Sequence, residues 1–153
     1  MKNYNLREST LSDAEYIAEH MRDLDRAELD AVGTTPKESL VAGLERSSIC
    51  ITALVDNHPA VMFGVAQFDD GAGHPWMLCT DDIDLVSFSL VREAKRWIRL
   101  MLEVYPILTN YVHSENDSAI RFIKMMGFEF PEDGEVIVPE TGEAFLRFEK
   151  YRG

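Results

Sequence analysis

A run of polar residues near the middle of the second half of the chain contains the side chains best suited to catalysis or ligand binding. His113 is followed closely by Glu115, and an imidazole can act as a general base near neutral pH. The alternative interpretation is a surface histidine without a catalytic role. Asn116, Asp117 and Ser118 follow, and these residue types either contact a ligand or cap the N-terminus of a helix. The sequence leaves both pairs of interpretations open.

Other residues of chemical interest lack the spacing that their chemistry requires. The histidines and cysteines show neither a C-x-x-C nor an H-x-x-x-H pattern, so no metal site is predicted. Cys50 and Cys79 are instead expected to pack as small apolar side chains in strands. Residues 69–74 contain two glycines, as phosphate-binding loops do, but they join two predicted strands and do not open a helix. We therefore predict a hairpin loop there.

The overall charge excludes several classes of partner. The chain has 153 residues with 15 basic and 27 acidic side chains, which gives a formal net charge of −12. Nucleic acids and anionic lipids require a basic surface, so neither is expected as a partner. No apolar run approaches the ~20 residues of a membrane span, and the polar N-terminus predicts no signal peptide. The cysteine usage predicts folding in a reducing compartment.

Helical and strand-like stretches alternate along the chain, which predicts one mixed α/β domain over residues 1–153. Ser12 and Glu15 have the spacing of a capping box and begin a helix that is predicted to end near Leu24. Thr35, followed by proline, begins a second helix that is predicted to end near Arg46. The predicted strands of this half are 3–8, 49–55, 60–68 and 76–80.

The second half begins with the longest predicted helix, in which apolar residues recur on one face from Phe88 to Tyr105 until Pro106 ends it. A short helix follows Asn116 and ends at Gly127. The predicted strands of this half are 108–113, 128–130, 136–138 and 144–151, of which the last two form a hairpin. Two strand–helix–strand units result, with right-handed connections if their strands are parallel.

The long predicted helix has basic side chains on the face opposite its apolar residues. Arg92, Lys95, Arg96 and Arg99 form the one locally basic patch of an acidic chain. Such a face is solvated by default, with nearby glutamates available for pairing at helical spacing. The alternative interpretation is a contact with an acidic partner or with the far end of a nucleotide.

The order of these elements resembles the GNAT acyltransferase fold, the family that moves an acyl group from coenzyme A to an amine. The most specific match is residues 116–128, NDSAIRFIKMMGF, because many members have N-x-x-A at the start of this helix and G-F at its end. The resemblance implies a mixed, mainly antiparallel sheet that is flanked by helices and splayed in the middle, between the strands at 76–80 and 108–113.

A narrower resemblance is to the small GNAT-like proteins of tailed phages and prophages, which include the small internal virion (core) protein of T-seven-like podophages. Besides residues 116–128, the features that carry it are residues 62–65 (MFGV), Pro75-Trp76, Thr80-Asp81 and Tyr105-Pro106. Together these resemblances cover the chain from about residue 7 to residue 148.

Two departures from the family pattern concern the cofactor. GNAT enzymes usually hold the coenzyme A pyrophosphate on backbone amides of a Q/R-x-x-G-x-G/A segment ahead of the long helix. The matching segment here, residues 80–88, contains no glycine. Its aspartates Asp81, Asp82 and Asp84 are expected to repel phosphate. Many members also have a tyrosine seven residues after the Asn, as general acid, where this chain has Ile123.

By resemblance, seven residues are candidates for an acyltransferase site. The candidates for binding acetyl-CoA are Leu78, Cys79, Thr80, Asn116 and Ala119, of which the first three would orient the pantetheine through their backbone amides. The candidates for catalysis, beside the acceptor cleft, are His113 and Glu115.

Three functions are compatible with these observations. The favoured one is a phage-encoded GNAT-fold protein with a degenerate acetyl-CoA site, which acts by binding a virion or host protein and is located in the virion or the host cytoplasm. The second is an active N-acetyltransferase, because positioning alone can accelerate acyl transfer from acetyl-CoA to an amine. The third is an acidic DNA mimic that inhibits a host enzyme. The acidic segments 23–30, 81–84 and 129–135 are otherwise expected to serve solubility.

Overall fold

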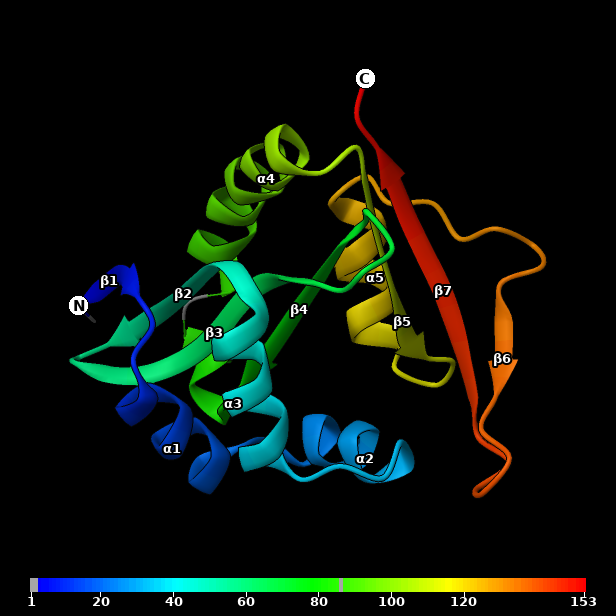
Figure 1. Cartoon of the computed structure of the whole chain (residues 1–153). Helices are drawn as coiled ribbons and strands as arrows, with labels where there is room; N and C mark the ends of the chain where they lie inside the picture. The colour runs from blue at the N-terminus through cyan, green and yellow to red at the C-terminus, as the bar shows by residue number, and fades with distance from the viewer. Residues whose placement is uncertain (1–2, 86) are drawn as a thin grey trace.

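The computed structural model describes residues 3–85 and 87–153, which contain a seven-stranded sheet in the order β1-β2-β3-β4-β5-β7-β6 (Figure 1). Neighbouring strands pair antiparallel except for β4 and β5, which are parallel. The strands are β1 (Tyr4–Glu8), β2 (Ser47–Val55), β3 (His58–Gln67), β4 (Gly73–Cys79), β5 (Ile107–His113), β6 (Glu135–Ile137) and β7 (Ala144–Tyr151). The predicted mixed, mainly antiparallel sheet is therefore confirmed.

Helices cover both faces of the sheet, because adjacent residues of a strand point to opposite faces. Met62 of β3 packs with α1 and α3, whereas its neighbours Val61 and Phe63 belong to the core beneath α4 and α5. The helices are α1 (Leu11–His20), α2 (Asp23–Ala31), α3 (Pro36–Arg46), α4 (Ser87–Val104) and α5 (Asp117–Met125), with a turn of 3-10 helix, η1 (Asp81–Leu85), before α4. None of the helices in the described ranges is both long and apolar enough to cross a membrane.

The apolar face predicted for the long helix is confirmed along α4, where Leu90, Ala94 and Met101 are buried. Val86 and the side chain of Phe88, to which the sequence prediction extends, lie outside the described residues. The other predicted helices and strands are present with ends within a few residues, apart from three corrections.

The first correction concerns the start of α1, where the predicted capping box at Ser12 and Glu15 is wrong. The cap is Thr10, whose Oγ1 accepts from the Asp13 amide at 3.3 Å, while Asp13 Oδ2 accepts from the Thr10 amide at 2.9 Å. The Asp13 side chain also forms an ion pair with Arg7 of β1. This contact with the sheet favours the box that uses Asp13.

The second correction concerns the predicted helix over 12–24, which is interrupted. α1 ends at His20, Met21 forms an isolated antiparallel bridge with Thr80, and α2 begins at Asp23. Met21 is extended, with φ −60° and ψ 139°. The bridge to Thr80, a distant part of the chain, causes this break. The sequence around Met21 contains no proline or glycine that would indicate it.

The sheet opens between β4 and β5, as predicted. Among the described residues of these two strands, only Gly73 and Leu108 are in register, and Asn110 Nδ2 of β5 donates to Pro75 O of β4 at 2.8 Å. A Cβ on Gly73 would lie 2.6 Å from the ring of Tyr105 and 2.7 Å from a methyl of Val65, so the packing of the Tyr105 ring against this strand requires glycine there. The parallel pair with α4 as its connection confirms the first predicted strand–helix–strand unit.

The third correction lies after α5, whose end is followed by the predicted C-terminal glycine, Gly127, with φ +91°. The predicted strand 128–130 is reduced to one bridge, between Glu129 and Glu149 of β7. Pro131 follows closely and has no N–H to extend a ladder. The predicted hairpin of β6 and β7 is confirmed, and β7 lies between β5 and the Glu129 bridge, so the second predicted unit has no adjacent parallel strands.

Candidate functional site

A cavity of about 990 Å³ occupies the opening between β4 and β5. Most of its lining is apolar and comes from β3, β4, β5, α4 and α5, with Trp76 on one side of the sheet and Trp97 on the other. Polar groups enter it from several elements, among them Arg22, the N-cap of α2, and Asp25 and Glu28 of α2 itself. The position of α2 therefore sets where these three charged groups lie in the cavity.

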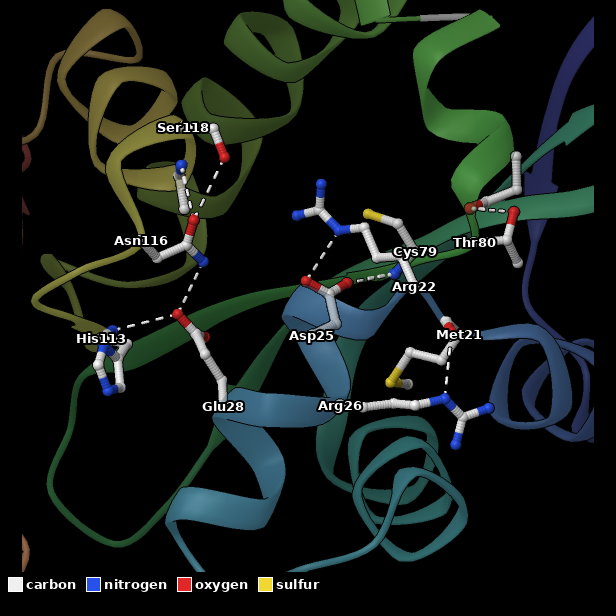
Figure 2. Close-up of polar contacts among 12 residues, drawn as sticks. Met21, Arg22, Asp25, Arg26, Glu28, Cys79, Thr80, His113, Asn116 and Ser118 are labelled. Carbon is white, nitrogen blue, oxygen red and sulfur yellow. Dashed lines mark hydrogen bonds and ion pairs between the residues drawn. The ribbon is translucent and has the colours of Figure 1, made fainter. Parts of the chain in front are cut away.

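Asp25 of α2 binds the β4 side of the opening (Figure 2). Its Oδ2 accepts from the Cys79 amide at 2.8 Å, and its Oδ1 accepts from Arg22 Nε at 3.0 Å. The side chain is only 4 % exposed. Burial raises the pKa of Asp25 above its ordinary value, and the attraction of Arg22 offsets only part of this rise.

The Cys79 amide, which donates to Asp25, is directed into the opening between β4 and β5. The Thr80 amide donates to Ala60 O of β3 at 2.8 Å. Successive amides of a strand point to opposite sides, so the Cys79 amide points away from β3, toward β5. Asp25 therefore occupies a hydrogen-bond donor that the splay would otherwise present to a ligand.

Glu28, one turn further along α2, binds the β5 side (Figure 2). Its Oε1 accepts from the His113 amide at 3.2 Å and from Asn116 Nδ2 at 2.8 Å. Residues three apart on a helix lie on the same face, which lets Asp25 and Glu28 reach opposite walls. The helix α2 thus spans the mouth of the splay with two carboxylates. Two acids of the segment 23–30, assigned by sequence to solubility, are internal acceptors instead.

Asn116 is the N-cap of α5, as one of the two interpretations predicted. Its Oδ1 accepts from the Ala119 amide at 3.2 Å and from Ser118 Oγ at 3.2 Å, and the residue is 3 % exposed. Its Nδ2 donates to Glu28, so both the oxygen and the nitrogen of the carboxamide have a partner within the protein. Asn116 and Ala119 line the cavity, as does Leu78 of β4. Their role in binding a cofactor stays a prediction.

Both ring nitrogens of His113 are hydrogen-bonded. Nδ1 accepts from the Glu115 amide at 3.1 Å, and Nε2 lies 2.9 Å from Glu143 Oε1. Since Nδ1 is an acceptor, Nε2 carries the proton of the neutral ring and donates to Glu143. A general base needs a free lone pair, which this arrangement leaves on neither nitrogen. Glu115 itself has an exposed side chain. The catalytic roles of His113 and Glu115 stay predictions.

The acidic segment before α4 also uses its amides internally. The Asp82 amide donates to Thr80 Oγ1 at 3.2 Å, and the Ile83 amide donates to Thr80 O at 3.2 Å. Asp81 and Asp84 are exposed on η1. These two amides are used within the turn, and the carboxylates of Asp81 and Asp84 beside them are anionic, which is unfavourable for a phosphate.

Sequence reasoning missed Arg22, Asp25 and Glu28. The spacing of the two acids was available as a signal, since side chains three apart share one helical face. Nothing in the sequence indicated the interruption at Met21. The predicted helix ended near Leu24, so Asp25 and Glu28 were not assigned to a helix. Their partners on β4 and β5 are distant in the chain, so no local pattern points to them.

Comparison with protein families gives one match. The family model described as "Bacteriophage T7, probable scaffold protein Gp13" matches residues 70–134, which contain β4, α4, β5 and α5. No curated protein matches the chain with statistical significance.

Solved structures resemble the whole chain. A GNAT-family acetyltransferase from Streptococcus pneumoniae superposes with a TM-score of 0.68 at 16 % identity, covering 99 % of this chain and 100 % of that one. A GNAT acetyltransferase from Bacillus anthracis gives 0.71 at 10 % identity, covering 97 % and 94 %. The aminoglycoside acetyltransferase AAC(6')-Ib in complex with coenzyme A gives 0.66 at 16 % identity, covering 98 % and 95 %. The chain therefore has the GNAT acetyltransferase fold.

Proposed function

We propose that this protein is a phage-encoded GNAT-fold protein whose acetyl-CoA site is degenerate. It acts by binding a protein, either inside the virion or on a host protein in the cytoplasm, and the whole chain serves as one domain. The observation that carries this proposal is the hydrogen bond from the Cys79 amide to Asp25 at 2.8 Å. A carboxylate of the protein itself stands at the amide that a thioester ligand would need.

Two further observations support a degenerate site. A ligand at the Cys79 amide must displace Asp25, which is also paired with Arg22. Two amides of the η1 turn, those of Asp82 and Ile83, donate to Thr80, and Ile123 lines the cavity where many family members have a tyrosine. A fold without the acetyl-CoA site and without the tyrosine proton donor remains suited to binding another protein. The match of residues 70–134 to a phage family supports the phage part of the proposal.

The alternative is an active N-acetyltransferase, and the cavity is the observation that favours it. A volume of about 990 Å³ between β4 and β5 could hold the arm of a cofactor if α2 moved away. AAC(6')-Ib, which shares the fold, is described in complex with coenzyme A. Binding of acetyl-CoA therefore separates the two functions.

The test is a thermal-unfolding scan with acetyl-CoA, with coenzyme A and with buffer. We expect no shift for the wild-type protein at millimolar ligand, whereas a ligand at a hundred times its dissociation constant would stabilise by ~2.7 kcal/mol. Asp25→Ala frees the Cys79 amide and is expected to raise affinity for acetyl-CoA. Asp23→Ala, which removes an exposed carboxylate of the same helix, is the matched control. Micromolar binding by the wild type would refute the proposal.

A further inference from the structure

The outer face of α4 has four basic side chains, Arg92, Lys95, Arg96 and Arg99, which we call the basic stripe. All four are exposed. Their spacing of three, four and seven residues places them on one side of the helix, opposite the buried Ala94 and the rest of the apolar face. At 1.5 Å per residue the stripe is about 10 Å long.

Several of the other basic residues are used within the protein. Arg7 and Arg22 form ion pairs with buried aspartates, and Arg152 donates to backbone carbonyls of Leu102 and Glu103. In the basic stripe, Arg96 has a carboxylate at 3.5 Å, on Glu93. Within the described ranges Arg92, Lys95 and Arg99 have no ion pair or hydrogen bond. Three of the four cations of the stripe are therefore not paired with a carboxylate of the described residues.

We propose that the basic stripe binds a short acidic segment of a partner protein, which extends the proposed function by giving the chemistry of its partner. Guanidinium groups bind carboxylates through paired N–H donors, and three of the four side chains are arginines. An acidic helix with carboxylates three, four and seven residues apart matches the spacing of the stripe. Complementary charge of this kind sets the partner and the register of a complex.

The surroundings of the stripe favour a short protein segment over a nucleic acid. Glu93 pairs with Arg96 of the stripe, and Glu103 lies one turn beyond Arg99 on the same face of α4. Positive charge therefore extends over about two helical turns and is limited by carboxylates. A duplex has one phosphate charge per ~1.7 Å and would continue into these acids, on a chain of net charge −12.

The proposal is tested with a labelled helical peptide that has glutamates at positions i, i+4 and i+7, by fluorescence anisotropy at low and physiological salt. We expect the wild-type protein to bind it, more weakly at higher salt. Arg92→Glu with Arg99→Glu should weaken binding at least tenfold. The control, Lys37→Glu with Arg46→Glu, makes the same change in net charge on exposed residues of α3, across the sheet, and should change affinity less than twofold.

Four results would overturn the proposal. They are no binding of the peptide by the wild type at low salt, an equal loss in the control variant, tighter binding of a short DNA duplex through the same arginines, and wild-type self-association that the Arg92 and Arg99 reversal abolishes. Circular dichroism verifies that the exposed substitutions leave the fold intact. The assay contains no coenzyme, so acetyl-CoA binding in the thermal scan would refute the degenerate site without affecting this result.

Discussion

Asp13 of α1 and Asp25 of α2 are both buried carboxylates, with 2 % and 4 % exposure, but their surroundings differ. Asp13 accepts two hydrogen bonds from Arg7, at 2.6 and 2.9 Å, and one each from the Thr10 amide and Thr52 Oγ1, both at 2.9 Å. Asp25 accepts one each from Arg22 and the Cys79 amide.

The pKa values of the two acids shift in opposite directions. Burial alone would raise the pKa of Asp13, but hydrogen bonds from Arg7, Thr10 and Thr52 outweigh it, so this pKa lies below its ordinary value. Burial raises the pKa of Asp25, and its two donors do not compensate. These directions predict that the Asp13 carboxylate stabilises the junction of α1 with the sheet, whereas the Asp25 carboxylate is held at the splay at a cost to stability.

The largest expected effect is from removal of the well-bonded acid. Asp13→Ala should lower the free energy of unfolding by about 3 kcal/mol, because it leaves buried donors unpaired and removes the cap of α1. Urea unfolding monitored by circular dichroism measures the change. Asp13→Asn, which keeps an acceptor but not the charge, should lose less. A loss below about 1 kcal/mol for the alanine variant would contradict the role given to Asp13.

Glu28→Ala should cost about 1 kcal/mol, because it removes the acceptor of the His113 amide and of Asn116 Nδ2. Amide hydrogen exchange should become faster at His113 than in the wild type. Glu28→Gln keeps an acceptor oxygen and should protect this amide nearly as well. Unchanged exchange in both variants would show that α2 does not hold the β5 wall.

Asp25→Asn should change stability by less than about 1 kcal/mol at neutral pH. The amide oxygen still accepts from Cys79, and the loss of the attraction to Arg22, whose side chain is 25 % exposed, is offset because the carboxylate charge of Asp25 is no longer buried. Urea unfolding of Asp25→Asn and of Asp13→Asn under the same conditions compares the two sites directly. Equal losses in the two variants would show that the acids are equivalent and remove the contrast between them.

The smallest effect is a pair of opposite pH trends, seen in unfolding free energies across acidic pH. Asp13 has a lowered pKa, so its stabilisation is complete above its unfolded value of 3.8 and is lost as the pH falls through the folded pKa. Asp25 has a raised pKa, so its unfavourable contribution grows as the pH rises from 3.8 through the folded pKa. Asp13→Asn should remove the first trend and Asp25→Asn the second, and failure of either variant to do so would contradict that pKa shift.

Much of the fold could be predicted from local signals. Thr35 and Asn116 are caps whose partners lie three residues away, and the hairpin of β6 and β7 follows from alternating residues around a turn. The start of α1 was missed because two overlapping capping boxes are present, and contact of Asp13 with Arg7 of β1 selects one of them. The GNAT fold could be inferred because its order of elements is written in such local patterns.

The sequence by itself determined the caps, the alternating strands, the basic stripe on α4 and the acidic character of the segment before it, since each depends on residues within a few positions of one another. Only the tertiary structure decided that α2 exists as a separate helix and that Asp25 and Glu28 bridge the splay. Their partners, Cys79 and Asn116, lie 54 and 88 residues away. Contacts across such separations form only when the sheet has assembled, so no local pattern specifies them.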